Sequence, residues 1–363
     1  MVSQGIERLD AIEPVFTRDT VRSVRAFARF FLAWLRIMWP DLLTMAVLAG
    51  VALGIHFAPL GSDVSRRTFP ITFDGSGDII YPTLAYPDRG WIIDSWLSGL
   101  LSSAVPILVV LVAQFHVRSF WDTNNAIMGI VSSILTGTLF QVVVKQVVGS
   151  FRPSFLDVCM PDVSLAAAHN ASGLNGVGFQ QVFYTAEICT QPDKEKLKVA
   201  MTSFPSGHAT VAAAAYVFLA LYINGKAKVF SARRPRLFDV ALLLNFLLTA
   251  FVLSAILTVD QAHHWYDIVA GFAISTITAL VSYRASYAAI WDWRFNHIPL
   301  LRNRTFSYDF DIPTYVRPTA IDYDAGWGIG DHCLRFREKP SATGDPPVEM
   351  TLQDLGRGNE STV

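Results

Sequence analysis

Apolar stretches separated by polar connections run along most of the chain. Six of them lack Asp, Glu, Lys and Arg, and most are roughly 20 residues long, enough for an α-helix to cross the apolar core of a bilayer. This pattern predicts an all-α fold, a polytopic membrane bundle of about six transmembrane helices. The stretches are Leu42–Leu60, Ser95–Phe115, Ala126–Val144, Ala209–Ile223, Val240–Val259 and Ile268–Tyr283.

The fourth and sixth stretches, Ala209–Ile223 and Ile268–Tyr283, are short for a complete span. Each of them follows a polar motif. They become long enough if the two helices begin inside those motifs, at Ser206 and near His263. We therefore expect polar side chains in the first turns of both helices.

Composition supports a membrane protein. The 363 residues are 52% hydrophobic and only 16% charged, whereas a soluble domain has about 25% charged residues. A large soluble α/β protein is therefore not expected. The net charge of −1 provides no basic field, so we expect no nucleic-acid partner. The first 36 residues mix acids with arginines and lack an apolar core followed by a cleavage site, so they do not form a cleavable signal peptide.

Arginine and lysine in the connections predict the orientation, because these residues are retained on the cytoplasmic side. The connection between the fourth and fifth stretches should be cytoplasmic, since it has five basic residues with no acidic residue among them. Counting from it places both termini in the cytoplasm and the connections 61–93 and 154–203 outside. The five basic residues are Lys226, Lys228, Arg233, Arg234 and Arg236.

The same reading divides the chain into three parts. Residues 1–40 form a cytoplasmic N-terminal segment, residues 41–290 the six-span membrane domain, and residues 291–363 a cytoplasmic tail. Beyond Asn303 the tail is rich in Pro, Gly and Asp with little apolar periodicity, so it is predicted to be largely disordered.

Three polar clusters lie beside the apolar stretches, and the predicted orientation places all three at the extracytoplasmic face. They are Lys145–Pro153 after the third stretch, Phe204–His208 before the fourth, and Asp260–Asp267 between the fifth and sixth. Ionisable residues at the edge of membrane helices are costly and usually functional. Their convergence therefore indicates a site.

The residue types in these clusters suit phosphate chemistry. His263 and Asp267 are four residues apart, so on the first turn of a helix they would share one face. The carboxylate could then hold the imidazole Nδ1–H and leave Nε2 free as a base or nucleophile. Ser206 and Gly207 at a helix start offer backbone N–H groups and the positive end of the helix dipole to a phosphate. His208 could donate a proton to a leaving oxygen.

Lys145 and Arg152 would add positive charge, and the guanidinium fork matches phosphate oxygens. Each feature alone also has a simpler explanation: a snorkelling lysine, an Arg-Pro helix stop, a Ser-Gly-His helix cap or a structural His–Asp hydrogen bond. Their occurrence together at one membrane face favours a single phosphate site.

Here the sequence resembles the type 2 phosphatidic acid phosphatase superfamily, which includes lipid phosphate phosphatases and vanadium haloperoxidases. The family signatures are Lys-x6-Arg-Pro, Pro-Ser-Gly-His and Ser-Arg-x5-His-x3-Asp. Lys145–Pro153 matches the first in full, Pro205–His208 matches the second in full, and His263–Asp267 matches the end of the third. The resemblance covers roughly residues 42–284.

This resemblance implies a role for each matching residue. His263 would be the nucleophile that takes the phosphoryl group, Asp267 would orient it, and His208 would protonate the leaving alcohol. The phosphatases of the family imply no metal or cofactor. The residues implied to hold the phosphate oxygens are Lys145, Arg152, Ser206 and Gly207.

One part of the third signature is missing. Ile256-Leu257 stands where the family has Ser-Arg, and no Arg or Lys lies between Asp239 and Arg284. A charge-assisted contact to phosphate contributes about 1.5 to 3 kcal/mol, so the loss keeps open a catalytically weak or inactive lipid-phosphate-binding protein. Arg66 or Arg67 from the first outward connection could substitute.

The predicted substrate is a phosphorylated lipid, because a site at the bilayer edge receives molecules whose tails stay in the membrane. Phosphatidate, lysophosphatidate, diacylglycerol pyrophosphate and sphingoid or isoprenoid phosphates all remain open. The stretch Arg152–Cys159 resembles eukaryotic lipid phosphate phosphatases more than bacterial undecaprenyl enzymes or the soluble haloperoxidases. A transporter would need ionisable residues deep within several spans, whereas here they lie at the edges.

The second outward connection predicts two modifications. Asn170-Ala-Ser is an N-glycosylation acceptor, whereas the acceptors at Asn303 and Asn359 fall in the predicted cytoplasmic tail and should stay unmodified. Cys159 and Cys189 would face an oxidising compartment, where they either pair or stay as thiols. Cys333 lies in the tail and should be a free thiol.

Overall fold

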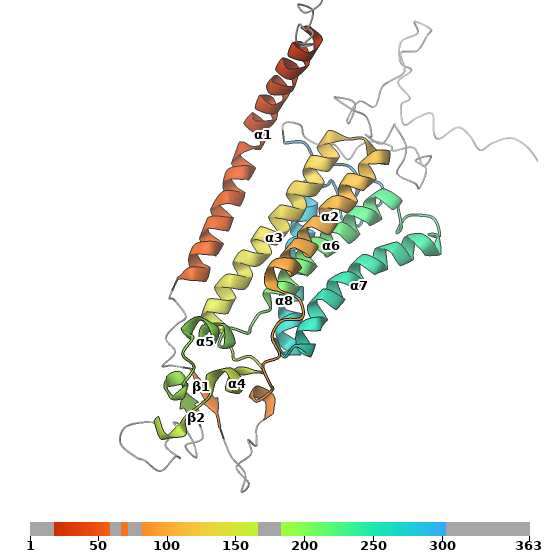
Figure 1. The fold of residues 1–363 in the computed structure, drawn as a ribbon. Helices are drawn as coiled ribbons and strands as arrows, with labels where there is room; N and C mark the ends of the chain where they lie inside the picture. Colours follow the sequence, from red (N-terminus) through yellow and green to blue (C-terminus); the bar gives the residue numbers. More distant parts are fainter. Residues whose placement is uncertain (1–17, 59–66, 72–81, 166–182, 303–363) are drawn as a thin grey trace, which may run out of the picture.

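The computed structural model describes residues 18–58, 67–71, 82–165 and 183–302, and within them the chain is mostly helical (Figure 1). Six of the described helices are long and apolar enough to cross a membrane, which confirms the predicted polytopic fold. They are α1 (Arg18–Phe57), α2 (Ser95–Val117), α3 (Phe120–Val148), α6 (Gly207–Ala227), α7 (Leu237–Val259) and α8 (Trp265–Ser286).

The first helix begins earlier than its charge-free stretch suggested. The prediction began at Leu42, but α1 begins at Arg18 and its apolar part at Phe30, so the helix crosses the expected boundary at residue 40. Arg36 and Asp41 interrupt the apolar run without breaking the helical hydrogen-bond ladder. Pro40 lies inside the helix, where a proline removes a single N–H donor.

The starts of α6 and α8 confirm the prediction that these helices begin inside polar motifs. Ser206 is the N-cap of α6, and its hydroxyl accepts a hydrogen bond from the Ala209 N–H. His264 is the N-cap of α8, next to His263. The two short apolar stretches thereby become helices of 21 and 22 residues.

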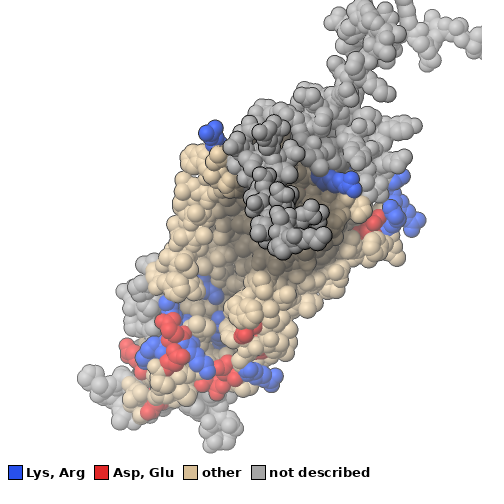
Figure 2. Space-filling model, turned by 45° about the horizontal axis from the view of Figure 1, so that its top comes forward, with Lys and Arg blue, Asp and Glu red and all other residues tan. Residues whose placement is uncertain are grey.

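Helix α6 lies at the centre of the bundle and packs against α2, α3, α7 and α8 (Figure 1). In its apolar window 83% of the residues are buried, compared with 11% to 33% for the other five spans. The run Ala212–Ala215 is fully buried, and such small side chains let membrane helices approach closely. Large apolar side chains on the other helices point outward, and in Figure 2 the charged residues lie near the two ends of the molecule.

Gly271 allows α8 to approach the start of α6. A Cβ at this position would lie 2.6 Å from the Ser206 carbonyl oxygen, closer than van der Waals contact permits. The same approach is fastened by the Ser206 N–H, which donates to the Asp267 carbonyl over 3.1 Å. A small residue in α8 therefore brings two of the polar motifs together.

A small cap covers the end of the bundle where α3 finishes and α6 and α8 begin (Figure 1). Strands β1 and β2 pair antiparallel with Phe69 opposite Tyr184, and both side chains belong to the core of the cap with Phe155 and Leu197. The elements of the cap are β1 (Thr68–Pro70), η3 (Pro82–Leu84), α4 (Phe155–Cys159), η4 (Val163–Leu165), β2 (Phe183–Thr185), η6 (Ala186–Ile188) and α5 (Lys194–Ala200).

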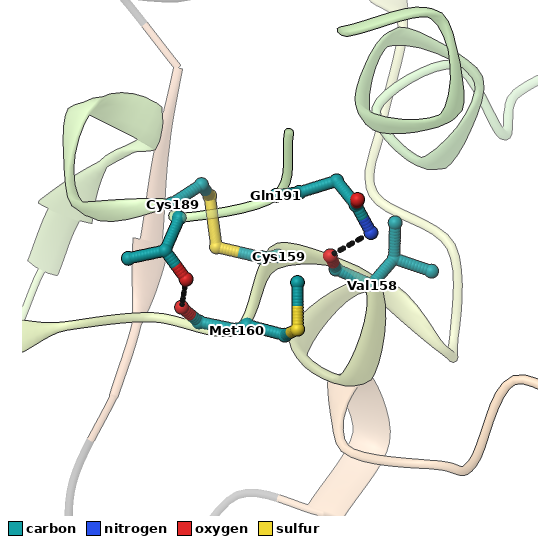
Figure 3. The surroundings of a disulfide bond; sticks show 6 residues. Val158, Cys159, Met160, Cys189 and Gln191 are labelled. Atoms are coloured by element: carbon teal, nitrogen blue, oxygen red, sulfur yellow. Dashed lines mark hydrogen bonds between the residues drawn. A yellow bond between two sulfur atoms is a disulfide. The ribbon is translucent and has the colours of Figure 1, made fainter. Parts of the chain in front are cut away.

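A disulfide between Cys159 and Cys189 joins two segments of the cap (Figure 3). Hydrogen bonds flank it: the Thr190 hydroxyl donates to the Met160 carbonyl, and the Gln191 amide donates to the Val158 carbonyl. Of the two alternatives left open by the sequence, the structure contains the paired form. Asn170, Asn303, Asn359 and Cys333 lie outside the described residues.

A buried polar network occupies the opposite end of the bundle. Lys226 in the last turn of α6 forms an ion pair of 2.5 Å with Asp122 in the first turn of α3. The hydroxyls of Tyr222 and Tyr287 also donate to the Asp122 carboxylate. The prediction counted Lys226 and Lys228 as loop cations, but both side chains are buried. Their ammonium groups are satisfied inside the protein, because backbone carbonyls, and for Lys226 also the Asp122 carboxylate, take the place of water. The exposed basic residues of that connection are Arg233, Arg234 and Arg236.

Candidate active site

Backbone hydrogen bonds bring the three polar clusters together. The Ser203 N–H donates to the Ser150 carbonyl, and the Phe204 N–H donates to the Gly149 carbonyl. These bonds join the end of α3 to the segment before α6, and the Ser206 bond to Asp267 adds the start of α8. The convergence expected from topology is therefore present in the structure.

His263 lies deep in this convergence, with only 3% of its surface exposed. Its Nδ1 is 3.5 Å from the Asp267 Oδ2. Burial lowers the pKa of His263 to about 3, against the opposite effect of its hydrogen bond to Asp267. A lowered pKa keeps the imidazole neutral at pH 7, the form in which a ring nitrogen can act as a nucleophile.

The position of His263 corrects one detail of the sequence prediction. His263 precedes the first turn of α8 instead of lying on it. The Asp267 carboxylate accepts the His264 N–H (2.9 Å) in a capping box, which makes His264 the N-cap and Trp265 the first residue of the helix. The two side chains still meet, because the connection from α7 folds back on the last turn of α7 and turns the His263 ring toward Asp267. Its fold is held by the His263 N–H, which donates to the Leu257 carbonyl.

Ser203 lies between the two groups and was not identified from the sequence. Its hydroxyl donates to the Asp267 Oδ2 over 2.5 Å and lies 3.3 Å from the His263 Nδ1. All three side chains are buried. The Asp267 carboxylate is therefore positioned by a hydroxyl, a backbone N–H and an imidazole together.

His208 is the second residue of α6, and its ring is held on two sides. It forms a hydrogen bond with the backbone of Ile93 and stacks on the indole of Trp91, with ring centroids 5.4 Å apart. The His208 Nε2 is buried and has no hydrogen-bond partner in the described part of the chain. A buried nitrogen of this kind is available to a ligand oxygen.

Two cations lie beside these imidazoles. The Lys145 ammonium donates to the Thr202 carbonyl over 3.0 Å, and the Arg152 Nε donates to the Val199 carbonyl over 2.8 Å. Burial lowers the pKa of Arg152 to about 10, and Asp260 acts in the opposite direction. The guanidinium therefore remains charged at neutral pH. Both cations also interact electrostatically with Asp267.

The Pro-Ser-Gly-His turn is fixed from α3. The Gln141 amide donates to the Pro205 carbonyl over 3.0 Å. Ser206 uses its hydroxyl as the helix cap, and Gly207 is the first residue of α6, where N–H groups at a helix start lack intrahelical partners. The turn thus presents the positive end of α6 beside Lys145 and His263.

A buried leucine occupies the position of the missing arginine. Leu257 is fully buried in an apolar cluster with Ala209 and Ile268, the residues that follow His208 and Asp267 in the sequence. Arg67, one of the two possible substitutes, donates through its guanidinium to the carbonyls of Met201 and Gln146. Arg66 lies outside the described residues.

The structure adds Ser203, Trp91 and Asp260 to the residues predicted from the sequence. Asp260 was visible in the third cluster, and its carboxylate accepts the Ile92 N–H. Ser203 directly precedes the second motif, and Trp91 had no sequence signal because it lies far from all three motifs. Among the described residues no group of three His, Cys, Asp or Glu side chains is arranged to hold a metal ion.

The chain is similar in sequence to several known proteins. A PA-phosphatase related-family protein of Dictyostelium discoideum is 31% identical over 219 residues, which is 60% of this chain and 63% of that protein. Lipid phosphate phosphatase 2 of Arabidopsis thaliana is 28% identical over 216 residues (60% of this chain, 69% of that protein). Lipid phosphate phosphatase 1 of Saccharomyces cerevisiae is 28% identical over 188 residues (51% and 56%).

This chain spans less than two thirds of the Dictyostelium relative, and no solved structure matches it. Residues 126–291 match the PAP2 superfamily. The matched region begins in α3 and extends past the end of α8, so it includes all three polar motifs and the helices that position them. This part of the chain is therefore a PAP2 superfamily domain, in a polytopic membrane protein similar to the lipid phosphate phosphatases.

Proposed function

We propose that this protein is a lipid phosphate phosphatase that hydrolyses phosphatidate-type phosphomonoesters or lipid pyrophosphates through a phosphohistidine intermediate. The observation that carries the proposal is the meeting of His263, Asp267 and His208 with the cations Lys145 and Arg152 at one end of a membrane bundle. The names of the Arabidopsis and yeast relatives support the same reaction class. The activity would belong to phospholipid metabolism.

In the first step the His263 Nε2 attacks phosphorus while the bond from phosphorus to the alcohol oxygen breaks. His208, as an imidazolium in the substrate complex, gives its Nε2 proton to that oxygen, and the lipid alcohol leaves. His208 then takes a proton from water, whose oxygen attacks phosphorus and breaks the phosphorus–nitrogen bond. Inorganic phosphate leaves and His263 is restored. Asp267 holds the imidazole in the orientation that this attack requires.

The phosphate oxygens would lie against Lys145, Arg152 and the start of α6 at Ser206 and Gly207. Positive charge preorganised in a buried site stabilises the charge that develops on a transferring phosphoryl group. The mechanism therefore uses no metal or cofactor, because a protein nucleophile and protein cations supply both requirements.

We place the site on the extracytoplasmic side and both termini in the cytoplasm, in a membrane of the secretory or vacuolar system or the plasma membrane. The exposed arginines Arg233, Arg234 and Arg236 lie between α6 and α7, at the end away from the site, as expected for a cytoplasmic connection. The Cys159–Cys189 disulfide lies at the site end, and disulfides persist in oxidising compartments. Two independent features thus support one orientation.

The test uses purified full-length protein in mixed micelles with a panel of phosphorylated lipids, and measures phosphate release with and without EDTA. We expect release from at least one lipid, unchanged by EDTA, and its loss in His263→Ala. Acid hydrolyses phosphohistidine, so the intermediate is measured with labelled substrate after an alkaline quench. Turnover that stops with EDTA, or that persists in His263→Ala, contradicts the mechanism.

A second function is kept because of Leu257. The family arginine at this position is replaced by a buried apolar side chain, so one phosphate contact is absent. The absence of this contact is also consistent with a protein that binds a lipid phosphate without hydrolysing it. Binding of labelled phosphatidate without phosphate release across the whole panel would select this function over hydrolysis.

A further inference from the structure

Trp91 contacts two residues of the proposed site from a distant part of the chain. Its indole stacks on the His208 imidazole, with centroids 5.4 Å apart and an angle of 21° between the ring planes. The central carbon of the Arg152 guanidinium lies 4.8 Å from the centroid of the indole. One side chain from the connection before α2 therefore touches both the proposed proton donor and one of the phosphate-binding cations.

The backbone next to Trp91 is fastened to the same site. The Ile92 N–H donates to the Asp260 Oδ2 over 3.4 Å, and the backbone of Ile93 is hydrogen-bonded to the His208 ring. Asp260 is 3% exposed, follows α7 directly and interacts electrostatically with Arg152. Three consecutive residues are thus held against the site, so the indole is anchored by the chain that carries it.

These contacts determine where two reactive groups point. An indole stacked on an imidazole restricts rotation of the ring, and the bond to Ile93 leaves the His208 Nε2 as the ring nitrogen without a partner in the described structure. The face of an indole attracts a guanidinium and orients its plane. Trp91 is 38% exposed, so part of its indole remains open to an arriving substrate.

We propose that Trp91 is a positioning residue of the reaction, which aims His208 at the leaving-group oxygen and holds Arg152 for the phosphate. This inference rests on the proposed function and extends it to the leaving group. Departure of a lipid alcohol requires a proton, whereas 4-nitrophenolate departs without one. Loss of the indole should therefore harm the lipid substrate much more than the activated ester.

The experiment compares kcat and KM of Trp91→Ala, Trp91→Phe and the parent on dioleoyl phosphatidate and on 4-nitrophenyl phosphate. A positioned general acid contributes about 10²- to 10⁴-fold to rate, so we expect Trp91→Ala to lower kcat on phosphatidate by about tenfold or more and on the aryl ester by less than about threefold. Phe keeps a stacking ring and should retain most of the activity. His208→Ala should show the same dependence on the leaving group.

A matched control is Trp96→Ala, since Trp96 lies in the first turn of α2 and is 68% exposed; its activity on both substrates should equal that of the parent. The Arg152 part of the inference is measured by calorimetric binding of inorganic phosphate, which should weaken about three- to tenfold in Trp91→Ala. Equal losses of kcat on the two substrates, or unchanged phosphate affinity, would overturn the inference. No turnover by the parent on either substrate would defeat the proposed function, and phosphate affinity would then still test Trp91.

Discussion

The Ser203 hydroxyl donates a 2.5 Å hydrogen bond to the Asp267 carboxylate across a sequence separation of 64 residues. The same hydroxyl lies 3.3 Å from the His263 Nδ1. In the proposed mechanism the orientation of the nucleophile therefore depends on a serine outside the three sequence signatures. A short bond to a buried carboxylate restricts the carboxylate to one orientation, and the imidazole follows it.

Ser203→Ala should lower kcat about tenfold and leave KM nearly unchanged. A hydrogen bond to a charged group contributes about 1.5 to 3 kcal/mol, and part of this would appear as a slower attack by a misoriented imidazole. The measurements are steady-state kinetics and the rate of phosphoenzyme formation in a single turnover. Ser133→Ala is the control, because Ser133 is equally buried and bonds to the Ala214 carbonyl inside the bundle. Equal kcat in the Ser203 and Ser133 variants would contradict this role.

Leu257→Arg should raise kcat/KM about tenfold while lowering the Tm of the ligand-free protein. The new guanidinium would replace a leucine that packs against Ala209 and Ile268, and burying a charge without a partner is destabilising. Bound phosphate would supply the partner, so added phosphate should raise the Tm more in this variant than in the parent. Leu257→Gln provides a polar control without charge. If kcat/KM falls in Leu257→Arg but not in Leu257→Gln, another group already occupies the position of the missing arginine.

Asp122→Ala should lower the Tm by several degrees without changing kcat of the folded fraction. It removes the carboxylate that faces the buried Lys226, and breaking a buried ion pair typically costs about 3 to 5 kcal/mol. The pair lies at the end of the bundle opposite the site, so the reacting groups should be unaffected. Thermal unfolding in detergent measures the effect. Asp239→Ala, which removes an ion pair with the exposed Arg236, should cost less than about 1 kcal/mol, and a similar Tm for the two variants would contradict the prediction.

Of the three glycosylation acceptors, only Asn170 should carry a glycan when the protein is made in a eukaryotic secretory pathway. Asn303 and Asn359 follow the last span and should face the cytoplasm. The measurement is the mass shift on glycosidase treatment of the parent and of Asn170→Gln. A glycosidase-sensitive shift that remains in Asn170→Gln would reverse the proposed orientation.

Much of the fold could be predicted from local sequence alone. Apolar length identified the six spans, and the polar residues before the two short stretches predicted that α6 and α8 begin in their motifs. These predictions succeeded because a bilayer requires about 20 apolar residues in a helix whatever its neighbours are. The predicted start of α1 was wrong for a related reason: a charged residue ends an apolar stretch, but it does not end a helix.

The sequence by itself determined the membrane class and the six candidate spans, and it predicted the residues that we propose bind and transfer phosphate, because residue type and spacing along the chain encode these properties. Only the tertiary structure decided that Ser203 bonds to Asp267, that Trp91 stacks on His208, that Cys159 pairs with Cys189, and that Lys226 is buried against Asp122. Each of these contacts joins residues far apart in the chain. Their formation depends on how close two helices or loops approach, as where Gly271 admits the start of α6, and no local pattern of hydrophobic and polar residues specifies that distance.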